Sequence, residues 1–337
     1  MAASLDNPIY TVYMVDGTTK YNLTPATLEI NLANQEKQVA QCATIDIVNI
    51  RTSGGETLCQ LLQVRKRIFI YANDGSRSEE VFRGWTWTKY HQSDVESSII
   101  TVKAYDNLIY LQESEDSLYF SKGNDTKSVM QTICNRWGIQ LNYTYSTITH
   151  SKLVLRGTLT DIFMSDVLDL VKERTGKKYV ITSQKDVMNI STVGTNTTIY
   201  KIEKKNNAIT VRYETSMDGM ITKVVILGKA DSDSEKQPVV ATVAGNTSQY
   251  GTLQKLQDKD EDTSLADAKK EAQNTINEKG KPTVEYEVET NDIPWIKKGD
   301  LVYVNAGHIG GRNLIAVGIE RTISNTKKTM TLSLIDP

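Results

Sequence analysis

Alternating polar and apolar residues fill most of the first third of the chain. Such alternation places the apolar side chains on one face of a β-strand. The pattern predicts strands at residues 10–15, 27–32, 43–48, 67–72, 81–87 and 98–105. About six short strands without a helix between them are typical of an antiparallel barrel or sandwich. Residues 1–116 are therefore predicted to form an N-terminal β-barrel.

Helical spacing replaces this alternation in the middle of the chain. Apolar residues recur every three or four positions in 126–137 and again in 161–175, which predicts two helices. Thr126 is the expected cap of the first helix. Two short strands are predicted within 178–191, so residues 117–198 read as an α+β unit.

Alternating segments return at residues 200–229 and again from 283 to the end of the sequence. Between them, 264–279 has helical spacing, and Ser264 can cap that helix. We therefore predict a middle α+β domain made of two separate segments, and a second β-barrel interrupted by it. The predicted segments are 117–198 and 231–281 for the middle domain, and 199–230 and 282–337 for the second barrel.

Three segments of the first β region recur in the same order in the last one. They are 68–71, 83–88 and 100–106 in the first region, and 301–304, 317–322 and 330–336 in the last. Each middle segment carries a glycine, Gly84 or Gly318. All strands share alternation, so only the order of the three segments favours a duplication. The predicted fold is α+β and β-rich, with two related antiparallel β-barrels that flank and interleave with the α+β domain.

Length, charge and cysteine content narrow the functional classes. The 337 residues allow two or three domains. With 39 Lys+Arg against 41 Asp+Glu the net charge is -2, which excludes the overall basic field of a dedicated nucleic-acid-binding protein. Three distant cysteines, Cys42, Cys59 and Cys134, predict neither a disulfide framework nor a Cys-rich zinc site.

Membrane and secretion signals are not evident in the sequence. No stretch approaches the roughly 18 apolar residues of a membrane span, and the N-terminus lacks the pattern of a secretory signal. We expect a chain made in a reducing cytoplasm, without a membrane anchor.

No catalytic, cofactor or metal site is predicted. His91, His150 and His308 do not share a metal-binding motif. Residues 307–312 resemble a hairpin loop more than a phosphate-binding loop, because the required glycine spacing and a following helix are missing. The acidic residues within 258–262 lie among lysines before a helix, which favours a solvated linker over a pair of catalytic carboxylates.

Four residues are candidates for an interaction surface. Trp85 and Trp87 are two positions apart on a predicted strand, so they share a face and are expected to be core or interface aromatics. His308 and Arg312 belong to the predicted hairpin loop near the end of the chain.

Several segments resemble baseplate hub proteins of contractile phage tails, especially the PBSX-type, XkdQ-like branch of the late-control-D-like hub family. They are 81–85, 100–111, 170–181, 250–254, 296–302 and 329–334. The resemblance extends over essentially the whole chain. Each motif is short, and their order together with the chain length carries the resemblance.

The resemblance implies a structural function without a reaction. Such a hub is a homotrimer in which each subunit supplies two related barrels, so that a trimer presents six similar docking surfaces to a hexameric tail tube and three to a trimeric spike. The implied partners are the tail tube protein, the central spike protein and other baseplate proteins. Tape-measure protein and DNA would pass through the lumen as cargo, and the hub would be assembled in a bacterial cytoplasm before joining the phage, prophage or tail-like bacteriocin particle.

Two other classes stay open at this point. One is a baseplate-associated peptidoglycan hydrolase, which would need two carboxylates converging in a cleft. The other is a carbohydrate-binding tail module, which would need exposed stacked aromatic rings.

Overall fold

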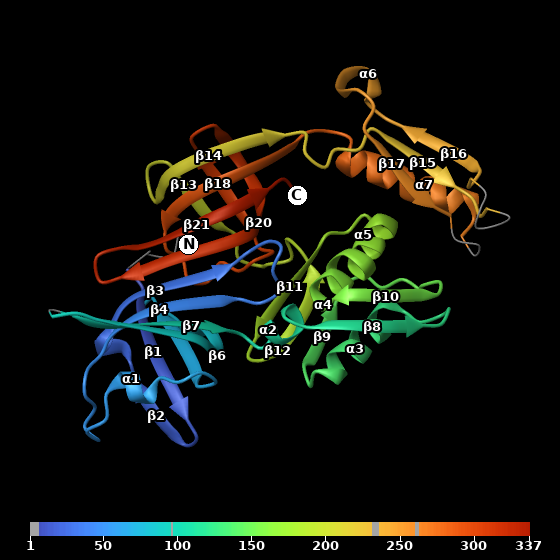
Figure 1. Ribbon diagram of the computed structural model, residues 1–337. Helices are drawn as coiled ribbons and strands as arrows, with labels where there is room; N and C mark the ends of the chain where they lie inside the picture. The colour runs from blue at the N-terminus through green and yellow to red at the C-terminus, as the bar shows by residue number, and fades with distance from the viewer. Residues whose placement is uncertain (1–6, 96, 231–235, 260–262) are drawn as a thin grey trace.

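One large sheet organises the molecule (Figure 1). The computed structural model describes residues 7–95, 97–230, 236–259 and 263–337. Thirteen strands join in the order β14-β18-β21-β20-β3-β4-β7-β6-β5-β1-β2, and β19 pairs with both β20 and β13. The predicted β-rich, α+β class is confirmed. Within the described residues no strand pair closes either half of this sheet on itself, so the two barrels stay a prediction.

The large sheet consists of a first half and a second half. The strands of the first half are β1 (Ile9–Asp16), β2 (Thr19–Asn22), β3 (Thr27–Asn34), β4 (Cys42–Val48), β5 (Arg67–Asn73), β6 (Ser78–Ser93) and β7 (Ser98–Tyr105). The strands of the second half are β13 (Tyr200–Glu203), β14 (Ala208–Ser216), β18 (Thr283–Asn291), β19 (Leu301–Ala306), β20 (Ile309–Ser324) and β21 (Lys328–Ile335). Two short helical turns, η1 (Thr24–Ala26) and α1 (Leu58–Leu61), complete the first half.

The two halves repeat one strand order. The neighbours β3-β4-β7-β6-β5-β1 correspond to β14-β18-β21-β20-β19-β13, and the corresponding strands also follow one another in the same order along the chain. One pairing differs, because β1 is antiparallel to β5 whereas β13 is parallel to β19. The similarity therefore covers six strands in each half, beyond the three segments that the sequence pattern matched.

Irregular features recur at the same places in both halves. The β3–β4 register shifts at Leu28, and the β14–β18 register shifts at the corresponding Ile209. The β6–β7 register shifts at Trp87, and the β20–β21 register shifts at the corresponding Val317. Since a β-bulge is a specific local feature of a strand pair, shared bulges are stronger evidence of a duplication than shared alternation.

A left-handed turn before β5 recurs before β19. Arg65 has φ 65° and Gly299 has φ 92°. The Arg65 amide donates to the Thr86 carbonyl (2.8 Å), and the Gly299 amide donates to the Ala316 carbonyl (2.7 Å). The amides of Thr86 and Ala316 donate in return to the carbonyl of the residue that follows Arg65 or Gly299, in both halves at 2.9 Å. Arg65 and Gly299 are therefore counterparts.

The predicted equivalence of Gly84 and Gly318 is wrong by four residues. The hairpin registers align Gly318 with Thr88 and Gly84 with Leu314. Gly84 precedes the bulge in β6, whereas Gly318 follows the corresponding bulge in β20, and the short repeated segments did not reveal this offset.

The middle of the chain forms a separate α+β unit. Its strands are β8 (Glu115–Phe120) and β10 (Leu153–Thr158) in one sheet, and β9 (Gln140–Thr144), β11 (Tyr179–Gln184) and β12 (Val187–Thr192) in another. Its helices are α2 (Ile109–Gln112), α3 (Thr126–Arg136), α4 (Leu159–Asp161) and α5 (Asp169–Thr175), with a π-helical stretch at Ile162–Leu168. They enclose a core of their own.

The predicted cap of α3 is wrong by one residue. Asp125 accepts the Ser128 amide at 2.7 Å and is the cap. Thr126 is fully buried and hydrogen-bonds the ring of His150 (2.9 Å). Both residue types suit a cap, and burial of Thr126 decides between them.

A second small unit is inserted between β14 and β18. It contains the sheet β16-β15-β17, the short helix α6 and the longer helix α7. Their bounds are β15 (Lys223–Leu227), β16 (Val239–Ala244), α6 (Thr247–Tyr250), β17 (Gln254–Asp258) and α7 (Leu265–Lys279). The Ser264 cap of α7 is confirmed. Residues 231–235 and 260–262, which include three of the acidic linker residues, lie outside the described residues.

The strand β15 does not belong to the large sheet. The sequence pattern grouped it with the second barrel as part of 199–230, but it pairs with β16 and β17. Ion pairs join this insertion to the middle unit, from Lys172 to Glu278 (2.6 Å) and from Arg174 to Glu271 (2.9 Å). No helix in the described ranges has the length and apolar character needed to cross a membrane.

Gly84 provides a test of the close packing of β6 on β7. A Cβ atom there would lie 2.3 Å from the carbonyl oxygen of Tyr105 and 2.6 Å from the ring of Phe82. We expect Gly84→Ala to lower the free energy of unfolding by about 1–3 kcal/mol, since overpacking forces the backbone apart. Urea unfolding measures the effect. The control is Gly310→Ala, where nothing lies within 4 Å of the added atom; equal stability of the two variants would contradict the prediction.

Candidate functional site

The two halves of the sheet meet where β3 pairs with β20, a contact that we call the seam. The pairing is antiparallel and runs from Ile319 opposite Asn34 to Ser324 opposite Glu29. Ile323 of β20 and Trp295, both from the second half, pack into the apolar core of the first half. The seam is therefore a packed contact as well as a set of backbone hydrogen bonds.

A buried charged cluster in the second half is linked to the first half by a hydrogen bond. Arg321 of β20 is 7% exposed and donates to the Asp292 carboxylate at 3.0 Å. Its guanidinium also donates to the carbonyls of Ile293 (3.1 Å) and Ile296 (2.7 Å). Asp292 accepts a further hydrogen bond from the Tyr10 hydroxyl of β1. Burial raises the pKa of Asp292 while Arg321 opposes that change, and burial raises the pKa of Tyr10.

A second buried cation holds the loop that follows β3. The Lys298 ammonium donates to the carbonyls of Gln35 (2.7 Å), Glu36 (3.1 Å) and Gln38 (2.9 Å). Burial lowers the pKa of Lys298 to about 8. Three acceptors satisfy all three donors of an ammonium group, so the charge is buried without an unpaired hydrogen.

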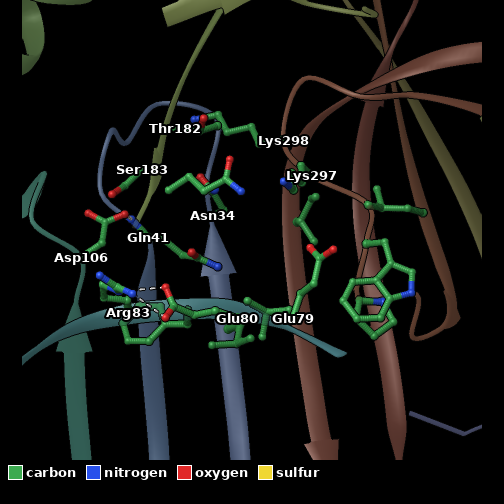
Figure 2. A pocket seen from close by; sticks show the side chains of 18 of the residues that line it. Asn34, Gln41, Glu79, Glu80, Arg83, Asp106, Thr182, Ser183, Lys297 and Lys298 are labelled. Atoms are coloured by element: carbon green, nitrogen blue, oxygen red, sulfur yellow. Dashed lines mark hydrogen bonds and ion pairs between the residues drawn. The ribbon is translucent and has the colours of Figure 1, made fainter. Parts of the chain in front are cut away.

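A polar cavity of about 100 Å³ lies beside the seam and is lined by residues of the first half, the second half and the middle unit. Figure 2 shows Asp106 and Arg83 of the first half on one side, Ser183 of β11 above them, and Lys297 on the other side. Asp106 is 3% exposed and accepts the amides of Gln41 (3.0 Å) and Leu108 (2.9 Å). Burial raises the pKa of Asp106 to about 7.

The tip of the β11–β12 hairpin attaches the middle unit to the first half. Both tip residues, Lys185 and Asp186, have positive φ, as a tight hairpin turn requires. The Asp186 carboxylate pairs with Arg67 (2.7 Å) and with Arg83 (3.3 Å), and Asn107 donates to the Asp186 carbonyl (2.6 Å). The middle unit and the first half are thus joined through side chains at a strand turn.

The chemistry of this junction is that of a clamp. Asp186 pairs with two arginines, Asp106 accepts backbone amides and Lys298 donates to backbone carbonyls. These groups come from the middle unit, the first half and the second half. Over the described ranges, no group of three or more His, Cys, Asp or Glu side chains comes close enough to hold a metal ion. The arrangement fixes the orientation of the two halves and the middle unit.

The structure brings the predicted tryptophans together. The guanidinium of Arg65 lies over the rings of Trp85 (5.3 Å) and Tyr110 (5.9 Å), and the Trp87 ring packs edge-on against Tyr110 (5.9 Å) and Tyr105 (6.3 Å). Trp85 is half-buried, and Trp87 is 36% exposed. They form a partly exposed aromatic and cationic surface on the first half.

His308 and Arg312 have separate contacts in the second half. His308 is in the β19–β20 turn, which confirms a hairpin at this place. The loop is shorter than the predicted 307–312, because residues 309–312 already belong to β20, so Arg312 is a strand residue. The His308 ring packs edge-on against Tyr213 (5.6 Å). Arg312 donates to the Tyr286 hydroxyl and pairs with Asp336 (3.2 Å). The contacts of these residues include neither each other nor the tryptophans, so their joint role stays a prediction.

The sequence pattern missed the residues that hold the seam. Arg321 carried the clearest signal, because it occupies an inward position between Ile319 and Ile323 in an alternating strand. An arginine on the apolar face of a strand needs a buried partner. Nothing in the sequence identified Tyr10 and Asp292 as that partner pair.

Comparisons with known proteins place this fold among phage tail proteins. The model of the YQBQ-like family matches residues 18–335. The phage-like element PBSX protein XkdQ of Bacillus subtilis (strain 168) is 24% identical over 265 residues, which is 77% of this chain and 79% of that protein.

Two solved structures share the fold over nearly the whole chain. The prophage MuSo2 43 kDa tail protein from Shewanella oneidensis has a TM-score of 0.70 at 14% identity, with 98% of this chain and 99% of that one covered. The E. coli c3393 protein has a TM-score of 0.58 at 9% identity, with 93% and 74% covered. It is described as a component of the type VI secretion system with structural similarity to the T4 bacteriophage tail proteins gp27 and gp5.

Removing the buried guanidinium tests the clamp at the seam. Arg321→Met leaves the Asp292 carboxylate buried without its cation, which is expected to lower the free energy of unfolding by about 3–5 kcal/mol. Arg312→Met on the same strand is the control. Arg312 pairs with Asp336, and these two side chains are 42% and 53% exposed. The control is therefore expected to lower the free energy of unfolding by about 0–1 kcal/mol. Chemical unfolding that shows equal losses would contradict the prediction.

The raised pKa of Asp106 predicts a pH dependence. Between its usual pKa of 3.8 and about 7, the folded protein keeps a proton that the unfolded chain has lost. The free energy of unfolding therefore falls as pH rises from about 4 to about 7, by up to about 4 kcal/mol. Asp106→Asn does not titrate and lacks this contribution. Chemical unfolding of both proteins from about pH 4 to about pH 7 measures this dependence. If the two free energies of unfolding differ by the same amount at every pH, the prediction is wrong.

Proposed function

Since the chain belongs to the YQBQ-like family of phage tail baseplate proteins, we propose that it is the structural hub of a contractile phage or phage-like tail baseplate. In this role it acts as a homotrimer and a symmetry adaptor. It joins a hexameric tail tube to a trimeric central spike and contacts other baseplate proteins. Tape-measure protein and DNA pass through its lumen as cargo.

The observation that carries this proposal is the internal repeat. Six strands recur in the same order with two shared bulges and a shared left-handed turn. Three copies of a chain with two similar halves present six similar surfaces in a ring, whereas the middle unit and the insertion occur once per chain and present three. The same chain can therefore match a sixfold partner on one side and a threefold partner on the other.

The clamp at the seam supports a load-bearing role. A hub that transmits force must keep its halves in one orientation, and buried charges with several partners disfavour alternatives because each lost partner leaves an unpaired buried group. Arg321 and Lys298 supply such contacts. The fold shared with a type VI secretion component supports the placement of this chain in a tail-type assembly. A virion or tail particle is thus its site of action.

The oligomeric state of the purified chain tests this proposal. Size-exclusion chromatography with light scattering should give a mass of about three times 37.7 kDa, because each hub subunit supplies one third of a closed ring. The same measurement on the chain co-expressed with its spike protein tests whether the trimer forms only when the spike is bound. A monomer at high concentration in both samples would overturn the proposal.

A further inference from the structure

The seam joins two strands that are not counterparts. It pairs β3 of the first half with β20 of the second. The counterpart of β3 is β14, and the counterpart of β20 is β6. Each half therefore contains both kinds of edge, and a single chain uses only one of the two possible contacts.

The remaining two edges are unpaired along the described chain. The strand β14 pairs with β18 alone, and residues 88–93 of β6 pair with β7 alone. In contrast, the matching part of β20 lies between β21 and β3. The two unused edges lie in different halves of the chain.

Burial differs as expected for an interface that is missing a partner. Leu32 of β3 is 2% exposed in the seam, whereas its counterpart Tyr213 of β14 is 55% exposed. Arg321 of β20 is 7% exposed, whereas its counterpart His91 of β6 is exposed. Positions that the seam buries are thus solvent-accessible on the unused edges.

We propose that β14 of one copy pairs with residues 89–93 of β6 of a second copy, in the register of the seam. This inference rests on the proposed trimer and specifies its subunit contact. Corresponding residues of β6 and β20 are 230 positions apart in the sequence, and corresponding residues of β3 and β14 are 181 positions apart. The seam pair Thr322–Asn31 therefore places Gln92 opposite Arg212.

Cross-strand chemistry in this register is favourable. The seam pair Glu320–Ala33 places Tyr90 opposite Glu214, so a hydroxyl donor faces a carboxylate. Gln92 faces Arg212 with an amide oxygen that can accept a hydrogen bond. No two like charges stand directly opposite each other over these pairs, which antiparallel strands require.

A side-chain contact beside the seam also has a counterpart. Lys298 donates to the Glu36 carbonyl, and the shared turn and strand registers make Val64 the counterpart of Lys298 and Met217 the counterpart of Glu36. Val64 is 55% exposed and Met217 is 45% exposed. Two exposed apolar residues therefore occupy the places where the chain has a polar contact internally, and their burial would stabilise association.

The contact is heterologous, because one copy uses β14 and the next uses β6. Heterologous contacts form rings when the rotation between copies closes. Within such a ring the seam and the contact between copies alternate. The two halves would then occupy similar environments, which explains why both kept the same strand edges.

Site-directed crosslinking tests the register. Gln92→Cys with Arg212→Cys should form covalent dimers and trimers under oxidation, since opposite strand positions bring Cβ atoms within disulfide reach. Either single variant and the pair Gln92→Cys with Val154→Cys are controls; Val154 is 70% exposed on β10. The native Cys42 and Cys134 are buried, and the single variants report any background from Cys59.

Charge substitution tests the apolar contact independently. Val64→Lys and Met217→Glu alone should each weaken association about tenfold, because each buries a charge in an apolar contact, and the double variant should recover association because the introduced ammonium and carboxylate can pair. Val154→Lys should have no effect. Trimers without the crosslink and without sensitivity to these substitutions would overturn the proposed contact and leave the hub function standing. Monomers under all conditions would overturn both.

Discussion

The pairing of β3 with β20 is the contact on which the rest of the structure depends. Backbone hydrogen bonds set its register, and the Arg321 guanidinium makes it specific. That buried group needs Asp292 and the carbonyls that follow it, while Asp292 in turn holds Tyr10 of the first half. Because an uncompensated buried charge is costly, the halves cannot separate or rotate without losing several bonds together. The orientation of the halves, and with it the cavity and the middle unit, follows from this constraint.

The seam and the proposed contact between copies involve corresponding strand edges, but their side chains differ in chemistry. Inside the chain, Lys298 reaches the carbonyls of the loop after β3, and both partners fold together. The corresponding positions, Val64 and Met217, are apolar and exposed. A contact between separately folded copies has to desolvate its surfaces on association, and this costs less for apolar groups than for an ammonium ion. The difference is consistent with a permanent internal contact and an assembled external one.

Much of the fold could be predicted because alternation and helical spacing are local signals. The strand predicted at 98–105 is β7 itself, and the helix capped by Ser264 is α7. The errors concern non-local choices. Gly84 and Gly318 carry the same local pattern but different registers, and β15 alternates like a strand of the large sheet yet pairs elsewhere. Local periodicity does not specify a strand's neighbour.

The sequence by itself determined the β-rich class, the order of the repeated segments and the resemblance to tail hub proteins, because these depend on the type and order of residues along the chain. Tertiary structure decided the site. Asp292 and Arg321 are 29 positions apart and meet within the second half, whereas Tyr10 is 282 positions from Asp292 and reaches it across the contact that β3 and β20 form. In the part of the chain that the structure describes, the same folding left one edge of β14 and one edge at the end of β6 unpaired. Both outcomes depend on which strand edges meet, and alternation with a period of two carries no information about the neighbour of an edge.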